Sequence, residues 1–213
     1  MHENNSVRRR AVAGFGLAAV AVIAVAGCSP DEEPAGNTAG ASQSVASVSP
    51  SESPASKHNE ADVEFTSTMI GHHRQAVMMS GLVEGRTDNA ELIALASSIE
   101  RAQNTEITEM ENRLESWGVD SPDMGDMGGG HGGHDDMPGM LSADQMTALR
   151  NSKGAAFDTL WLEGMIRHHE GAIAMADAVL ADGVDPATKA LAAEVKKAQQ
   201  PEIEQMNGML GRS

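Results

Sequence analysis

The sequence predicts an all-α protein in which two repeated helical hairpins form a four-helix bundle. Apolar residues recur at every third or fourth position along most of residues 58–212, which is the spacing of one helix face. Alanine, leucine and methionine supply most of the apolar mass and tyrosine is absent, which favours helices over sheet. A long segment also recurs without a gap 96 residues later. Such a match predicts two copies of one supersecondary unit.

Each copy of the repeat contains a histidine pair, flanking methionines and a later Gln-x-x-Glu. The first copy is Met69-Ile70-Gly71-His72-His73-Arg74-Gln75-Ala76-Val77-Met78-Met79, and the second is Met165-Ile166-Arg167-His168-His169-Glu170-Gly171-Ala172-Ile173-Ala174-Met175. Further along, Gln103, Glu106, Ile107, Met110 and Leu114 return as Gln199, Glu202, Ile203, Met206 and Leu210. We therefore expect the same side chains to meet in both hairpins.

Capping residues and glycines set the expected ends of the first two helices. Asn59 can cap the first helix, and Gly85 is expected to stop it. Residues 88–91, Asp-Asn-Ala-Glu, predict a capping box for the second helix. Gly118 is expected to end that helix.

The second half is expected to begin with a short helix capped by Ser142. This helix should break near residues 151–154 and continue as a long helix to about residue 181. Asp185 can then cap the last helix, with Pro186 at its first position and its end near residues 208–211.

The amino terminus predicts an export signal over residues 1–27. Arg8, Arg9 and Arg10 precede a short apolar stretch rich in alanine and valine, followed by small residues. This pattern is typical of a cleaved secretory signal rather than of a spanning helix. The cysteine that follows, Cys28, resembles the lipid-modified cysteine of bacterial lipoproteins. The alternative is an ordinary signal peptide with a chance cysteine.

Residues 28–57 are expected to form a disordered tether, because they are rich in Ser, Pro, Ala and Glu and contain almost no large apolar residue. Cys28 is the only cysteine. Lipidation would therefore leave no thiol for a disulfide or a thiolate metal site. Soft-metal chemistry would depend on methionine and histidine.

The chain is strongly acidic, with a formal net charge of −16, and cleavage after residue 27 would remove three arginines and one glutamate. This charge argues against nucleic acid and anionic membrane surfaces as partners and favours cations. The alternative is that an acidic surface simply keeps an exported protein soluble.

Helical spacing places polar residues on otherwise apolar faces. His72 and His73 straddle the stripe that contains Met69 and Met79, and the second helix carries Gln103 and Glu106 within its apolar stripe. A turn near residues 87 and 88 would set His72 level with Gln103 and Met69 level with Glu106. The second copy repeats this arrangement with His168, His169, Met165, Met175 and Glu202.

Buried imidazoles and carboxylates must satisfy one another or hold an ion, because each costs free energy when unpaired. We therefore regard the histidines, methionines and glutamates of both copies as candidate metal ligands. The alternative is structural: a His–Gln or His–Glu bond can serve only to fix register, and methionine at helical spacing is usually core filler.

The connector between the hairpins, residues 119–141, predicts a second metal-binding element. Glycine and aspartate separate its thioethers and imidazoles, which suit Cu(I) above all and then Cu(II) or Ag(I). The candidate ligands are Met124, Met127, His131, His134 and Met137. The alternative is a low-complexity linker whose methionines are accidental.

The two Met-Ile-x-His-His-x-x-Ala-x-x-Met segments, each followed by Gln-x-x-Glu-Ile-x-x-Met, resemble the bacterial family called domain of unknown function 305. The resemblance covers about residues 57–210. It implies a ferritin-like four-helix bundle with the histidines and methionines clustered. It also implies a copper role, since some members are exported proteins tied to copper binding and tolerance.

Three functions follow as hypotheses. The first is a lipid-anchored copper-binding protein outside the membrane that sequesters copper or passes it to a copper-handling partner protein. The second is a di-metal oxidase, but such bundles need Glu-x-x-His motifs, which these helices lack. No nucleophile–base arrangement stands out either, so we do not expect an enzyme. The third is an interaction module that binds no metal.

Overall fold

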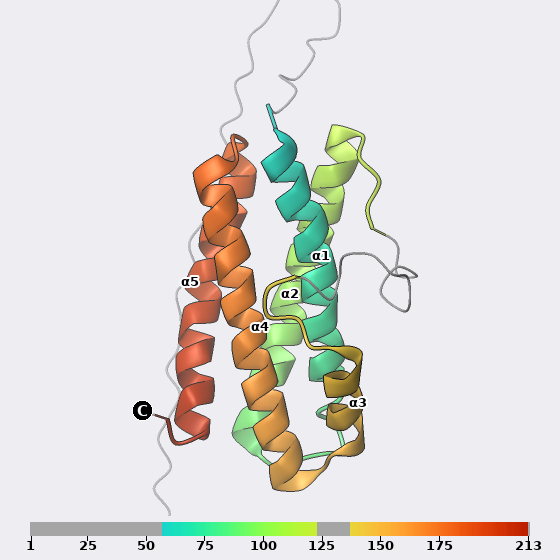
Figure 1. The fold of residues 1–213 in the computed structure, drawn as a ribbon, viewed down its shortest axis with the longest axis vertical. Helices are drawn as coiled ribbons and strands as arrows, with labels where there is room; N and C mark the ends of the chain where they lie inside the picture. Colours follow the sequence, from blue (N-terminus) through green and yellow to red (C-terminus); the bar gives the residue numbers. More distant parts are fainter. Residues whose placement is uncertain (1–56, 123–136, 213) are drawn as a thin grey trace, which may run out of the picture. The chain divides into compact units, whose positions relative to one another are not determined.

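The computed structural model describes residues 57–122 and 137–212, where it forms five α-helices and no strand (Figure 1). The protein is therefore all-α, as the sequence predicts. The helices are α1 (Glu60–Gly81), α2 (Ala90–Trp117), α3 (Ala143–Asn151), α4 (Gly154–Asp182) and α5 (Pro186–Met209). Within those two ranges, no helix is long and apolar enough to cross a membrane.

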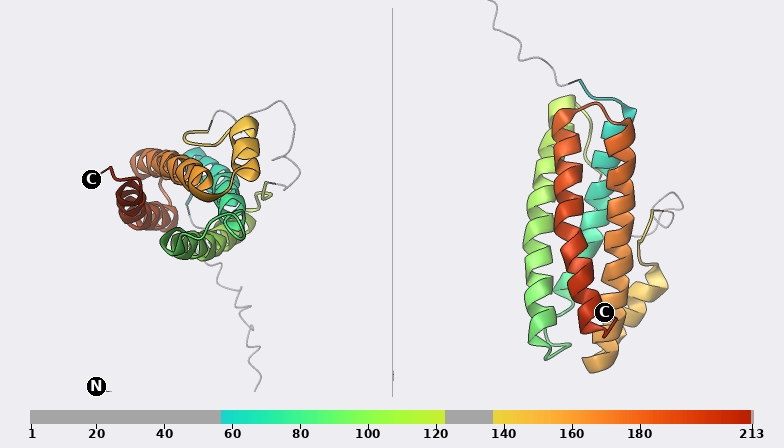
Figure 2. Two further views of the ribbon diagram at one scale, coloured as in Figure 1. Left: turned by 90° about the horizontal axis from the view of Figure 1, so that it is seen from below. Right: turned by 90° about the vertical axis from the view of Figure 1, so that its left-hand side faces the viewer.

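Four long helices lie side by side, and the short helix α3 lies beside one end of them (Figure 2). Helix α1 packs along α2, α4 packs along α5, and the two pairs meet where α1 packs against α4. Trp161 of α4 is fully buried, and its indole N–H donates to the carbonyl of Met79 in α1 at 3.0 Å. This bond ties the two helix pairs together.

Most helix ends follow the capping signals in the sequence. Asn59 and Ser142 form reciprocal capping boxes at α1 and α3, and Asp185 caps α5 with Pro186 behind it. The cap of α2 differs in detail: Asn89 alone accepts from the backbone at residues 91 and 92. Helix α1 ends at Gly81, not at Gly85. The latter, with φ of 70°, lies in the turn that follows.

The buried apolar residues form two clusters, one in each half of the helices' length. One cluster joins the carboxyl-terminal half of α1 to the amino-terminal halves of α2 and α4 and the end of α5. The other joins the opposite halves of the same four helices. The stretches between the clusters carry the repeated histidines and glutamines, so a polar layer divides the core.

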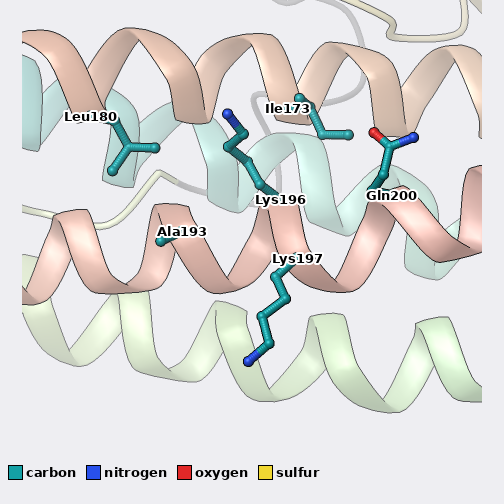
Figure 3. A pocket seen from close by; sticks show the side chains of 6 residues that line it. All are labelled: Ile173, Leu180, Ala193, Lys196, Lys197 and Gln200. Carbon is teal, nitrogen blue, oxygen red and sulfur yellow. The ribbon is translucent and has the colours of Figure 1, made fainter.

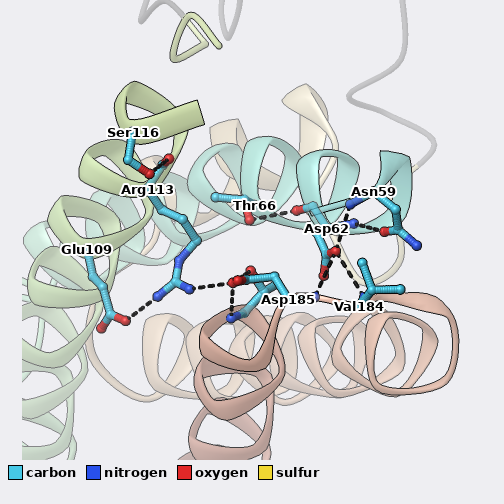
Figure 4. A network of polar contacts seen from close by, with 9 residues as sticks. Asn59, Asp62, Thr66, Glu109, Arg113, Ser116, Val184 and Asp185 are labelled. Atoms are coloured by element: carbon cyan, nitrogen blue, oxygen red, sulfur yellow. Dashed lines mark hydrogen bonds and ion pairs between the residues drawn. The ribbon is translucent and has the colours of Figure 1, made fainter. Parts of the chain in front are cut away.

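A second buried polar region lies where α1 and α5 begin (Figure 4). Oδ2 of Asp62 accepts from the backbone N–H groups of Asn59, Val184 and Asp185 at 3.0–3.1 Å. Oδ2 of Asp185 accepts from Thr188 and from Arg113. These bonds fix the start of α1 to the turn between α4 and α5.

Candidate functional site

The polar layer consists of side chains from all four long helices. Each of its members has at most 3% of its surface exposed. They are His72 and His73 on α1, Gln103 on α2, His168 and His169 on α4, and Gln199 on α5. Helical periodicity explains their burial, because each lies on the stripe that its helix turns toward the core.

The outer histidines of the layer each bind a glutamate of the neighbouring helix. Nε2 of His73 lies 2.6 Å from Oε2 of Glu106, and Nε2 of His169 lies 2.7 Å from Oε2 of Glu202. The expected meeting of imidazole and carboxylate is present in both pairs. The register between the helices differs by about one turn from the predicted one. Glu106 was expected level with Met69, but it binds His73, four residues further along α1.

The inner histidines lie against each other. The ring centroids of His72 and His168 are 3.8 Å apart, and their planes are tilted by 40°. Nε2 of His168 donates to the carbonyl of His72, and Nε2 of His72 donates to the carbonyl of Pro138, each at 3.0 Å. A carbonyl can only accept, so both inner rings carry their hydrogen on Nε2 and leave Nδ1 as a lone pair.

Burial keeps the inner pair uncharged. Desolvation lowers the pKa of His72 to about 3, although the Pro138 carbonyl opposes the shift. Desolvation also lowers the pKa of His168 well below its usual value, and the neighbouring histidines add to the effect. Both rings are therefore neutral at physiological pH, which is the form that binds metal ions.

The layer leaves eight buried polar atoms without a hydrogen-bond partner among the described residues. They are Nδ1 of all four histidines and both amide atoms of Gln103 and Gln199. Leaving such an atom unpaired costs about 1–3 kcal/mol. In the outer pair, Nε2 of each ring binds a carboxylate, the kind of partner found behind metal-bound histidines.

Three of the four candidate methionines of the repeat are fully buried. Met69, Met79 and Met165 have no exposed surface, whereas Met175 is only half-buried. Met69 and Met165 each precede the first histidine of their copy by three residues and belong to opposite apolar clusters. Their thioethers thus flank the layer from its two sides.

No three His, Cys, Asp or Glu side chains of residues 57–122 and 137–212 lie together in the way a metal site of these residues alone requires. A metal ion held in the layer by three or more side chains would therefore need a methionine sulfur or a glutamine oxygen among its ligands. Both kinds of side chain are present on the same buried stripes.

Four predicted ligands, Met124, Met127, His131 and His134, lie outside the described residues, as does the predicted lipidation site Cys28. Met137 is described and is half-buried. The sequence did not predict that the connector contacts the layer. In the structure it does so through the Pro138 carbonyl. The only signal for this contact was that Gln75 in the first copy is replaced by Gly171 in the second.

These features define a class: an all-helical protein whose core is divided by an incompletely bonded histidine layer with a neutral inner pair. The chain belongs to the family described as domain of unknown function (DUF305), whose sequence profile matches residues 62–210. A DUF305 protein from Streptomyces coelicolor, described as secreted, is 32% identical, with 71% of this chain and 92% of that chain covered and a TM-score of 0.63. A DUF305 fragment from Deinococcus radiodurans is 29% identical, with 73% and 98% covered and a TM-score of 0.63.

A further similar structure is CopM in its Cu(II)-bound form. It is 30% identical, covers 70% of this chain and 94% of its own, and has a TM-score of 0.59. CopM has also been solved with Cu(I), with Ag and without metal. No curated protein matches the chain.

Proposed function

We propose that the protein binds copper outside the cytoplasm and holds it in the histidine layer, either to sequester it or to pass it on. The observation that carries the proposal is the set of four buried Nδ1 atoms without partners. A core that only needed to fix helix register would pair these atoms or replace the residues with apolar ones. Unpaired Nδ1 atoms of this kind, with buried thioethers on the same helix stripes, are suited to a soft cation.

The chemistry of the layer favours copper over harder ions. Imidazole nitrogen and thioether sulfur suit Cu(I) and, with more nitrogen, Cu(II), whereas Mg²⁺ and Ca²⁺ require oxygen. The copper- and silver-bound structures of CopM support the same choice. The His–Glu pairs would orient the outer imidazoles and increase their basicity.

The repeat also supports an architecture for this site. His72 and His168 are 96 residues apart and in contact, and each outer histidine meets a glutamate 33 residues further along. We propose that a duplicated hairpin built a ferritin-like four-helix bundle in which each copy supplies half of the layer. The Gly/Met/His-rich connector would capture copper near it.

Competition against a Cu(I) chelator tests the proposal. The combined substitution His72→Ala and His168→Ala should weaken Cu(I) binding by more than roughly 100-fold, because losing two ligands exceeds the 10–100-fold cost of losing an outer partner. His58→Ala is the matched control, since His58 stacks on Trp117 near the ends of α1 and α2. Circular dichroism should show unchanged helicity in both variants.

A second variant separates the layer from the connector. Replacement of Met124, Met127, His131 and His134 by serine should weaken tight Cu(I) binding by less than about tenfold, because helix-borne ligands are ordered by folding. Glycine-rich segments lose about 1 kcal/mol or more per residue when fixed. If the serine variant loses tight binding and the double histidine variant keeps it, the layer is structural and the proposal is wrong.

We further propose that the protein is exported and anchored by a lipid on Cys28. The lipoprotein-like residues Val25-Ala26-Gly27-Cys28 support this, as does the description of the Streptomyces relative as secreted. Cys28→Ala should release the folded protein from membranes. Retention of that variant in the membrane fraction after a carbonate wash would argue against the anchor.

A further inference from the structure

The end of the connector forms a strap, residues Met137–Leu141, that lies across α1 and α4. Gln75 holds it from α1: its amide N–H donates to the Leu141 carbonyl at 2.9 Å, and its amide oxygen accepts from the Leu141 N–H at 2.7 Å. Both bonds are buried. The strap is thus fixed to α1 by a two-point bond of the kind that joins neighbouring strands.

On the other side, the backbone of the strap packs directly against the backbone of α4. A Cβ added to Gly171 would lie 1.9 Å from the Pro138 carbonyl oxygen, and one added to Gly139 would lie 2.2 Å from the Arg167 carbonyl oxygen. Gly139 has φ of 80°, a conformation that favours glycine. Any side chain at Gly171 would push the strap off α4.

Gln75 and Gly171 occupy the same place in the two copies of the repeat. One copy supplies the side chain that binds the strap, and the other supplies the space that admits it. The two copies have therefore diverged in a complementary way, although their histidines are unchanged. Both positions therefore contribute to holding the strap in place.

The strap also supplies the hydrogen-bond acceptor for Nε2 of one layer histidine. His72 donates from Nε2 to Pro138, whereas His73 and His169 use glutamates and His168 uses a helix carbonyl. Outer partners fix the tautomer and orientation of a ligating imidazole. Of the four, only the partner of His72 lies outside the four long helices.

We propose that Gln75 and Gly171 are positioning residues that hold the strap against His72 and so set which ring nitrogen His72 turns into the layer. The metal half of this inference rests on the proposed function. If His72 held a metal ion through Nδ1, its Nε2–H would be a stronger donor to Pro138, and the strap would be held more tightly. By reciprocity, a docked strap would increase the affinity of the layer for metal.

The test uses the full chain, Ag(I) as a redox-inert probe, and the variants Gln75→Leu and Gly171→Ala. In the metal-free protein, ¹⁵N shifts of the His72 ring should report the Nε2–H tautomer in the wild type and a mixture in both variants. Ag(I) affinity should fall roughly tenfold or more in both variants. In the wild type, Ag(I) should slow exchange of the Leu141 amide hydrogen.

The matched control is Gln200→Leu, because Gln200 lies at the surface, lining a hollow of about 420 Å³ between α4 and α5 (Figure 3). It should keep the wild-type tautomer and affinity. An unchanged His72 tautomer in both strap variants would overturn the inference. If the tautomer shifts but the wild type binds no Ag(I), the positioning role stands and the proposed metal function fails.

Discussion

The two buried polar regions of the protein differ in how completely their atoms are bonded. Where α1 and α5 begin, Oδ2 of Asp62 and Oδ2 of Asp185 each accept three hydrogen bonds (Figure 4). Only Oδ1 of Asp62 and Nε of Arg113 remain unpaired there. The central layer leaves eight such atoms, on six side chains.

This difference is what a structural role for the first region and the proposed binding role for the second would produce. Polar atoms that cap helices and join turns find their partners within the chain, and the fold gains their energy directly. Polar atoms left unpaired in the core lower the stability of the metal-free protein, and a bound ion would restore it. Substitutions in the two regions should therefore shift stability in opposite directions.

The largest change in stability is expected in the hydrogen-bond network of Asp62, Asp185 and Arg113, called the end network below. Asp185→Ala removes the cap of α5 and leaves Arg113, whose side chain is 11% exposed, without its buried partner. We expect the free energy of unfolding to fall by about 3 kcal/mol, as for a broken buried ion pair, with unchanged metal affinity. Urea denaturation measures the first quantity and chelator competition the second.

Glu109→Ala is the matched control for that variant. Glu109 binds the same arginine but is 51% exposed, so its loss should cost less than about 0.5 kcal/mol. Equal losses from the two substitutions would show that the network at the ends of α1 and α5 is not a specific tie.

Apolar substitution in the layer should have the opposite sign. Gln103→Leu combined with Gln199→Leu removes four unpaired buried amide atoms at nearly constant volume. We expect the free energy of unfolding of the metal-free protein to rise by about 2 kcal/mol in urea denaturation, because each of the two buried amide groups costs about 1 kcal/mol or more when left unpaired. A loss of stability would mean that ordered water or neighbouring groups satisfy these amides, and the contrast between the regions would disappear.

The outer carboxylates should affect binding more than folding. Glu106→Gln with Glu202→Gln keeps an acceptor for each histidine but removes the charge that strengthens the imidazole as a ligand. We expect Cu(I) affinity to fall roughly 10-fold and the free energy of unfolding to change by less than about 1 kcal/mol. A drop in stability without a drop in affinity would mean that the two His–Glu pairs have a structural role instead.

Local sequence signals were sufficient for the helices and for half of the layer. Caps such as Asn59, Ser142 and Asp185 act within one turn, so their effect can be read from adjacent residues. That the histidines of each copy meet a glutamate of the neighbouring helix also follows from helical period and a short turn, although the predicted register was about one turn off. These interactions lie within a single helix pair, where register is constrained.

The remaining features depend on contacts between distant segments. Met79 and Met175 hold the same position in the two copies, yet Met79 is fully buried and Met175 is half-buried. The difference comes from the segments packed around each residue. Met79 lies beside Gly164, and its backbone carbonyl accepts the hydrogen bond from Trp161. The strap over His72 is likewise a tertiary contact, which no periodicity within one helix can indicate.

A further predicted difference between the two regions is their pH dependence. His72 has its pKa lowered to about 3 from 6.5 by burial, and the pKa of His168 is lowered as well. Below pH 6.5 the unfolded chain binds protons on these residues that the folded protein does not, so stability falls as the pH falls from 6.5 toward 3. Each histidine contributes a slope of at most about 1.4 kcal/mol per pH unit.

The end network titrates in a different range. Burial raises the pKa of Asp185, but bonds from Thr188 and Arg113 outweigh it and hold the pKa below 3.8. The stabilisation by Asp185 is therefore present above pH 3.8 and lost as the pH falls further.

Between pH 4.5 and 6, the pH dependence of the free energy of unfolding of the metal-free protein should thus come from the layer histidines. In urea denaturation, His72→Leu with His168→Leu should flatten this dependence, whereas Asp185→Asn should leave it unchanged. An unchanged slope in the histidine variant would mean that the inner pair is protonated or solvated in the folded protein. The neutral lone pairs on which the proposed copper binding depends would then not exist.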